Sequence, residues 1–387
     1  MSALRGRDIV CVGFAEWRAE LWTNQHHLMS RLARDNRVLF VESLGLRRPQ
    51  LAGRDVRRIA RRLATGLRGP RAEDGLHVLS PLVLPLHDRA WARRLNARLL
   101  PALVGRAARR QGLHDPLLWG YVPQAEMLLD VLRPAQVLYH CVDDIAAHER
   151  IDTQSFAAAE ERFARRADVV LASAPALVEK MQRLSDRVVY APNVADTEAF
   201  ARALDEGPVD AALAALPRPR LVFTGAVSAI KLDVELLAGV ARARRDWTLA
   251  LVGPVGLGDP TTDVSALEAE PNVHLLGRRD YAELPAVLRG ADAGLIPYRR
   301  SALTDAIFPM KVYEYLAAGL PVVATELPSL AGVDDVARAG DAERFVAAVE
   351  HALAADSPNE RRRRSAAAQA HSWDARLGEI AEALERA

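Results

Sequence analysis

Short apolar runs rich in β-branched residues alternate along the whole chain with longer segments of helical period. Apolar runs without polar interruption are typical of strands that helices cover on both faces of a sheet. Their alternation with helices favours a parallel α/β architecture. The expected strands are 8–14, 38–41, 77–79, 117–121, 137–142, 169–172, 188–190, 221–224, 249–252, 273–276, 294–297 and 322–324, with helices such as 154–166 and 234–244 between them.

The length of 387 residues predicts more than one domain, because single cores stop growing at about 250–300 residues. The alternation breaks at 205–219, where Asp-Glu-Gly-Pro and Pro-Arg-Pro flank a short alanine-rich segment. We therefore expect two Rossmann-like domains, 1–204 and 205–370. The remaining segment, 371–387, is expected to form a closing amphipathic helix that could cross back to the first domain.

Composition excludes several classes of protein. The 51 basic and 50 acidic residues leave a formal charge of +1, so the molecule as a whole is not built to bind polyanions. Two cysteines, Cys11 and Cys141, exclude a disulfide scaffold and a cysteine-rich zinc site. No stretch approaches the roughly 20 apolar residues of a transmembrane helix, and the expected location is cytoplasmic. Lysine occurs only at positions 180, 231 and 311.

Segment 54–68 reads as a basic amphipathic helix, with apolar residues at helical spacing and six arginines on the other side. Such a helix could lie on an anionic membrane surface as a peripheral contact. It could equally pack on its own domain and expose a solvated arginine face. Nucleic acid is not an expected partner, because no aromatic stacking residues interleave with the arginines.

The most informative segment is 308–325, Phe-Pro-Met-Lys-Val-Tyr-Glu-Tyr-Leu-Ala-Ala-Gly-Leu-Pro-Val-Val-Ala-Thr. It predicts a loop, a helix from about Lys311 to 318, a stop at Gly319 and a buried strand. A helix that begins at the carboxyl end of a strand can bind phosphate. Lys311 would add a point charge, and Glu314 could accept hydrogen bonds from a ribose diol. A capped surface helix with a lysine–glutamate pair is the other interpretation.

The pattern Pro-x-Lys-x-x-Glu-Tyr-Leu-Ala-x-Gly-x-Pro-Val-Val resembles the donor-site signature of GT-B glycosyltransferases, close to glycosyltransferase family 4 and to its branch in bacterial polysaccharide and natural-product glycosylation. Segments 137–144, 191–196, 223–231, 272–277 and 281–285 resemble further family motifs, so the resemblance covers nearly the whole chain. It implies two Rossmann-like domains that face each other across a cleft, with a nucleotide sugar bound by the second.

The resemblance also implies site residues. Gly225 would let the backbone approach the diphosphate, Ser228 lies in the same loop, and Lys231 would neutralise the phosphates. Lys311 would be a second phosphate contact, and Glu314 would hold the ribose. Two of the three lysines therefore fall on expected phosphate positions, where an ammonium acts as a point charge. No cofactor or bound metal is implied beyond the nucleotide sugar.

Within the second domain, the chain departs from the family pattern at two points. Ala226 stands where many members carry an arginine, and Arg278, Arg299 or Arg300 could substitute for it. Ala306 stands where many members carry a glutamate that contacts the donor sugar, so the neighbouring Asp305 becomes a candidate sugar ligand.

In the first domain, His140, Asp143 and Asp144 follow a strand at its carboxyl end, where α/β sheets bind ligands. Asp143 could orient an acceptor hydroxyl or remove its proton, and His140 could hydrogen-bond the transferred sugar. Asp144 could contact the acceptor or merely cap the following helix. His26 begins another helix and is a candidate acceptor or sugar ligand, although paired histidines on a helix are more often surface residues.

The expected function is transfer of a sugar, with a hexose expected, from a nucleoside-diphosphate sugar to the hydroxyl of a small-molecule or lipid-linked acceptor. The resemblance implies retention of the anomeric configuration; with inversion, Asp143 would be the base. Two alternatives stay open. One is a nucleotide-sugar epimerase or hydrolase of the same fold, and the other is a non-catalytic partner that binds a nucleotide sugar.

Overall fold

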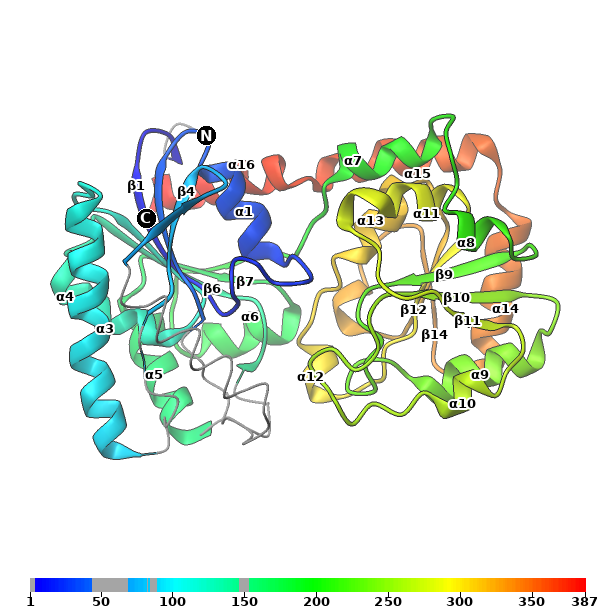
Figure 1. Ribbon diagram of the computed structural model, residues 1–387, viewed down its shortest axis with the longest axis horizontal. Helices are drawn as coiled ribbons and strands as arrows, with labels where there is room; N and C mark the ends of the chain where they lie inside the picture. Colours follow the sequence, from blue (N-terminus) through cyan, green and yellow to red (C-terminus); the bar gives the residue numbers. More distant parts are fainter. Residues whose placement is uncertain (1–3, 44–68, 82, 84–88, 146–152) are drawn as a thin grey trace. The chain divides into compact units, whose positions relative to one another are not determined.

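The computed structural model of the protein describes residues 4–43, 69–81, 83, 89–145 and 153–387 (Figure 1). The chain divides into two compact units. The first unit is Met1–Pro192 together with Arg376–Ala387, and the second unit is Asn193–Ala375. Each unit has its own parallel sheet with helices packed on it.

The sheet of the first unit has the strand order β3-β4-β2-β1-β5-β6-β7-β8. All neighbours are parallel except β3 and β4, which form an antiparallel pair. The strands are β1 (Asp8–Val12), β2 (Arg37–Val41), β3 (Arg71–Glu73), β4 (Leu76–Leu79), β5 (Leu117–Gly120), β6 (Gln136–Cys141), β7 (Val169–Ala172) and β8 (Val188–Tyr190). The helices described are α1 (Asn24–Leu32), α3 (Ala90–Arg110), η2 (Pro123–Leu128), α4 (Leu129–Leu132), α5 (Thr153–Arg166) and α6 (Pro175–Gln182).

The sheet of the second unit has the order β11-β10-β9-β12-β13-β14 and is parallel throughout. Its strands are β9 (Arg220–Thr224), β10 (Thr248–Val252), β11 (Val273–Leu275), β12 (Ala293–Ile296), β13 (Val322–Thr325) and β14 (Val336–Ala339). The helices are α7 (Thr197–Ala201), η4 (Arg202–Leu204), α8 (Ala211–Ala214), α9 (Val234–Ala243), α10 (Ser265–Glu268), η5 (Tyr281–Glu283), α11 (Leu284–Arg289), α12 (Ala302–Asp305), α13 (Lys311–Ala317), η6 (Pro328–Leu330), α14 (Ala342–Ala354), α15 (Pro358–Ala368) and η7 (Gln369–His371). Helix α16 (Trp373–Arg386) follows.

Both sheets reverse their strand order beside a central strand. In the second unit the reversal lies between β9 and β12, and in the first it lies between β1 and β5. Open α/β sheets bind ligands at the carboxyl ends of the strands where the order reverses. The candidate residues that follow β9, β12 and β6 therefore lie at the carboxyl ends of the strands, where a ligand is expected.

The observed division between the two units differs from the predicted domain boundary. The division falls at Pro192–Asn193, before the predicted linker at 205–219, because α7 and η4 pack on α13 and α11 of the second unit. Residues Arg376–Ala387 group with the first unit. There the Gln136 side-chain amide donates to the Leu384 carbonyl at 2.8 Å.

The predicted basic helix at 54–68 lies outside the described residues, so its proposed membrane contact stays a prediction. Among the residues that the structure does describe, none of the helices is both long and apolar enough to span a bilayer.

Candidate functional site

The loop that follows β9 passes very close to the loop that follows β10. Gly225 has a φ of +119°, a conformation that favours glycine. A Cβ at Gly253 would lie 1.9 Å from the Gly225 carbonyl oxygen, so the second loop also requires glycine. The Thr224 N–H donates to the Tyr315 hydroxyl at 2.8 Å and fixes the end of β9 against α13. These contacts hold the end of β9, and with it Gly225, beside α13.

Lys311 extends from α13 toward this loop. Its ammonium group donates to the Tyr298 hydroxyl at 2.8 Å and lies 5.1 Å from the centroid of the Phe223 ring. A Cβ at Gly225 would be 3.6 Å from the Lys311 ammonium nitrogen, so the lysine reaches the glycine loop directly. Tyr298, which follows β12, thus holds Lys311 at the reversal point of the sheet.

Lys231 and Glu314 gather around the same phenol. The Arg299 N–H donates to the Lys231 carbonyl at 2.8 Å, which brings the glycine-loop lysine alongside Tyr298. Burial would raise the pKa of the Tyr298 hydroxyl, but Lys311 and Lys231 together hold it below its ordinary value, while Glu314 opposes them. The structure therefore brings together Lys231, Lys311 and Glu314, the predicted phosphate and ribose contacts.

Glu314 is a buried carboxyl that lies one turn beyond Lys311. Its residue is 7% exposed, and within the described part of the chain its carboxylate has no hydrogen bond or ion pair. Burial raises the pKa of Glu314 to about 7, and Lys311 moderates that rise. A buried carboxylate without hydrogen-bond donors in the protein is stabilised when a ligand supplies those donors, so it favours ligand binding. The ribose role of Glu314 stays a prediction.

The other candidates of the second unit have varied surroundings. Ser228 is buried, and its carbonyl accepts the N–H groups of Lys231 and Leu232, which shapes the turn that presents Lys231. Arg278 pairs with Asp280 at 3.1 Å on the surface. Asp305 pairs with Arg300 at 2.7 Å. A donor sugar would therefore compete with Arg300 for the Asp305 carboxylate. Arg299 is exposed and, in the described residues, has no ion pair.

In the first unit, His140 is the last residue but one of β6 and is buried. Its Nε2 is 3.5 Å from the Asn24 amide nitrogen, and its ring stacks on Tyr121 with centroids 4.9 Å apart. Burial, aided by the charge of Arg376, lowers the pKa of His140 to about 3. The imidazole is therefore neutral at physiological pH, and it can donate or accept a hydrogen bond but not act as a cationic acid.

Asp143 and Asp144 follow β6 and are both half-buried. Asp144 pairs with Lys180 at 2.8 Å, and Lys180 also pairs with the buried Glu160 at 2.7 Å. The Tyr139 hydroxyl donates to Glu160 at 2.7 Å, which completes a polar network between β6, α5 and α6. The structure thus gives Asp144 a partner in the protein, and the acceptor roles of both aspartates stay predictions.

His26 is engaged by the backbone on both ring nitrogens. The Thr23 N–H donates to Nδ1 at 3.1 Å, and Nε2 lies 3.0 Å from the Glu16 carbonyl oxygen. This arrangement is a capping box at the start of α1. Burial lowers the pKa of His26, which keeps the ring neutral. A sugar or acceptor could hydrogen-bond His26 only by displacing one of these contacts.

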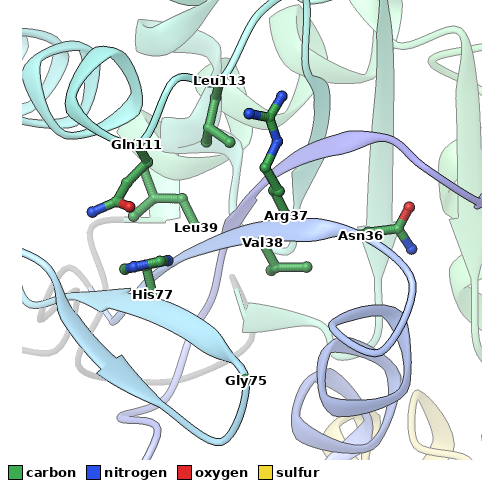
Figure 2. A pocket seen from close by; sticks show the side chains of 8 residues that line it. All are labelled: Asn36, Arg37, Val38, Leu39, Gly75, His77, Gln111 and Leu113. Atoms are coloured by element: carbon green, nitrogen blue, oxygen red, sulfur yellow. The ribbon is translucent and has the colours of Figure 1, made fainter.

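A cavity of about 110 Å³ opens in the first unit at the amino ends of β2 and β4 (Figure 2). It is lined by Arg37, His77 and Gln111 among others, and Arg37 pairs with Asp8 through two hydrogen bonds of 2.7 Å. The cavity contains none of the candidate residues and lies at the edge opposite His140. Over the described residues no group of His, Cys, Asp and Glu side chains is arranged to hold a metal ion.

Two residues that organise these sites, Tyr298 and Lys180, were not predicted from the sequence. Tyr298 directly follows the predicted strand at 294–297. This position in the sequence was enough to identify it as a residue at the carboxyl end of a strand. Lys180 was left without a role because its partners, Asp144 and Glu160, are 36 and 20 residues away in the sequence. Asp144 lies in the motif at 137–144, but no motif marks Glu160 or links either residue to Lys180.

Residues 218–355 match the family model described as glycosyl transferases group 1. The second unit therefore carries a domain of this family. For this part of the chain, the match confirms the resemblance predicted from the sequence. The chain is 32% identical over 227 residues to a Bacillus subtilis protein named as a teichuronic acid biosynthesis glycosyltransferase, TuaH. The alignment covers 55% of this chain and 56% of that relative, about half of each.

Solved structures confirm the fold over nearly the whole length. Sucrose-phosphate synthase from Thermosynechococcus elongatus has a TM-score of 0.68 at 15% identity and covers 98% of each chain. HepE of Anabaena, in complex with UDP, has a TM-score of 0.67 at 14% identity, covering 98% of this chain and 100% of HepE. The predicted α/β fold of two Rossmann-like domains is therefore correct.

Proposed function

We propose that this protein transfers a sugar from a nucleoside-diphosphate sugar to an acceptor hydroxyl. One observation carries the proposal: Lys231, Lys311 and the buried Glu314 gather around the Tyr298 phenol beside the Gly225 loop. Two ammonium groups suit a diphosphate, and a carboxylate that lacks donors suits a ribose diol. The group 1 domain at 218–355 supports this assignment of the donor.

The proposed reaction breaks the bond between the anomeric carbon and the diphosphate oxygen. The two lysines stabilise the negative charge that develops on the leaving diphosphate, and such preorganised electrostatic stabilisation is usually the largest contribution to catalysis. The acceptor oxygen then bonds to the anomeric carbon, and its proton passes to the departing phosphate. We infer retention of configuration from the family resemblance. No bound metal is needed in this mechanism, because ammonium groups already neutralise the diphosphate.

UDP is the first nucleotide to test, since HepE has been solved with UDP and with UDP-glucose. The name of the Bacillus relative favours polysaccharide biosynthesis over natural-product glycosylation as the pathway. The acceptor is then a growing saccharide chain or its lipid-linked precursor. His140, Asp143 and Asp144 are the proposed acceptor and sugar contacts in the first unit.

Thermal-shift measurements with UDP, GDP, dTDP and ADP test the donor, because a ligand that binds only the folded state raises the melting temperature. We expect one nucleotide to stabilise the wild type and to lose most of that effect in Lys311→Met. Arg338→Met, which removes an exposed cation elsewhere in the second unit, should respond like the wild type. Transfer assays with the preferred nucleotide linked to different sugars then identify the donor sugar. Repeating them with EDTA tests whether transfer needs a metal ion.

Four outcomes would contradict the proposal. Rapid donor turnover without any acceptor would indicate a hydrolase or epimerase. Binding without turnover over a broad acceptor panel would indicate a non-catalytic partner. Equal nucleotide binding by the wild type and Lys311→Met would refute the assigned site. Loss of transfer with EDTA would refute the metal-free mechanism.

A further inference from the structure

Helix α3 (Ala90–Arg110) has an unusual charge distribution for this chain. Its 21 residues include six arginines and no acidic residue, although the whole protein has a formal charge of only +1. Its inner face packs on η2 and α4, and Gly105 permits close approach of Val131. Its outer face consists of residues at helical spacing that are all exposed: Trp91, Arg94, Leu95, Arg98, Arg106 and Arg109.

The arginines of this outer face have no ion-pair partner in the described part of the chain. None of Arg94, Arg98, Arg106 and Arg109 contacts a carboxylate there. The contrast with α15 (Pro358–Ala368) is direct. In α15, Arg361 and Arg364 both pair with Asp356, and Arg363 pairs with Asp335. An arginine-rich helix of this protein can therefore have its guanidinium groups paired, as α15 does, so the unpaired arginines of α3 are a distinct feature.

The amino-terminal end of the outer face also exposes two large apolar side chains. Trp91 is 58% exposed and Leu95, one turn further, is 41% exposed. Tryptophan favours the interface between water and lipid, and arginines beside it favour anionic headgroups. From Trp91 to Arg109 the face extends for about 27 Å at 1.5 Å per residue. Charge and apolar anchors thus lie on one continuous stripe.

We propose that the outer face of α3 is a docking surface for an anionic lipid bilayer. The helix would lie along the membrane surface, with Trp91 and Leu95 among the headgroups and the arginines against lipid phosphates. Nucleic acid fits this surface less well, because a single tryptophan at one end offers no stacking platform along the stripe. The proposal is independent of the sugar-transfer proposal, since no donor residue lies on α3.

Co-sedimentation of the full chain with vesicles tests the proposal. We expect binding to phosphatidylglycerol-containing vesicles at low salt, release at high salt, and no binding to pure phosphatidylcholine. Each arginine near an anionic surface strengthens binding about fivefold, so Arg94→Glu with Arg98→Glu should lower the partition coefficient by about thirtyfold or more. Arg183→Glu with Arg338→Glu makes the same change in net charge at exposed arginines elsewhere and should bind like the wild type.

Trp91 gives a second readout that does not depend on charge. Vesicles with brominated acyl chains should quench the tryptophan fluorescence of the wild type more than that of Trp91→Phe. Thermal melts of all variants establish that they are folded. Absence of binding to anionic vesicles at low salt would overturn the proposal. So would an equal loss in both double variants, or tighter α3-dependent binding to duplex DNA than to vesicles.

Discussion

Lys180 forms two ion pairs, with Asp144 and with the buried Glu160, and it is itself only partly exposed. Burial would lower the pKa of Lys180, but Glu160 and Asp144 together hold it above its usual value. All three lysines of this arginine-rich chain thus lie near buried polar groups. The sequence identified two of them through a motif and could not identify the third, whose partners are remote in the chain.

Replacing Lys180 should destabilise the protein. Lys180→Met leaves Glu160 buried without its counter-charge, and we expect a loss of roughly 2–4 kcal/mol in the free energy of unfolding. Urea denaturation measures this loss. Adding Glu160→Gln to Lys180→Met should recover part of it, because the uncompensated charge is then removed. No recovery in the double variant would contradict the explanation.

Glu314 should make stability and nucleotide binding depend on pH in opposite directions. Its folded pKa of about 7 lies above the ordinary value of 4.5, so the unfolded chain loses the proton first. The stability contributed by the protonated carboxyl is complete below pH 4.5 and is lost as the pH rises through 7. The free energy of unfolding of the wild type should therefore fall relative to Glu314→Gln between those values.

Nucleotide affinity should change in the other direction, because a ribose diol donates to the ionised carboxylate. We expect UDP affinity of the wild type to rise between pH 6 and pH 8, whereas that of Glu314→Gln stays level. Isothermal titration calorimetry at several pH values measures both. Parallel pH profiles in the two proteins would show that Glu314 does not hold the nucleotide.

Tyr298 is expected to position Lys311 rather than to contact the sugar. Tyr298→Phe removes the hydroxyl that accepts from the Lys311 ammonium group. Loss of one such hydrogen bond costs about 1 kcal/mol, so UDP affinity should fall about fivefold. Tyr190→Phe, at an exposed tyrosine of the first unit, is the matched control. Unchanged or tighter binding in Tyr298→Phe would contradict this role.

At the level of elements, every strand that the sequence predicted occurs in the structure within one or two residues of its expected ends. Continuous apolar runs buried on both faces made these strands recognisable. The strands that were missed, β3 and β14, contain charged and small residues, Arg-Ala-Glu and Val-Ala-Arg-Ala, and lie at the edges of their sheets. Helix α3 was not among the helices named from the sequence, and Pro101 lies inside it.

The approach of the loops after β9 and β10 should not tolerate a single added methyl group. Gly253→Ala would place a Cβ 1.9 Å from the Gly225 carbonyl oxygen, and both loops would have to move. We expect nucleotide binding to be lost with a clear drop in melting temperature. Gly332→Ala, where a Cβ meets nothing within 4 Å, should leave both unchanged. Normal binding by Gly253→Ala would place the nucleotide elsewhere.

At the level of the whole molecule, the division into two sheets and the family of the second unit could be inferred from the sequence. The arrangement of charged groups around Tyr298 could be anticipated only in part, because a motif gives spacing along one helix and not contacts between loops. The first-unit candidates were least predictable. Whether His26 or Asp144 is available to a ligand depends on their hydrogen bonds with Thr23, Glu16 and Lys180.

Two separate cores predict that nucleotide binding protects only part of the chain. UDP should slow hydrogen exchange in β9 and α13 of the second unit and leave the core strands β1 and β5 of the first unit unchanged. Mass spectrometry of peptides from the intact chain measures exchange in both units. Equal protection of β1 and β5 would mean that the two units unfold together.

The assignment of residues 376–387 to the first unit has a consequence for synthesis. During translation, Asn193–Ala375 emerges as one uninterrupted stretch and can complete its fold as soon as it leaves the ribosome. The first unit is translated earlier, but it stays incomplete until α16 has been translated, because Leu384 of that helix contacts Gln136 of β6. The half that is translated first is therefore finished last, and truncations after Ala375 should harm the amino-terminal half rather than the half to which they are adjacent.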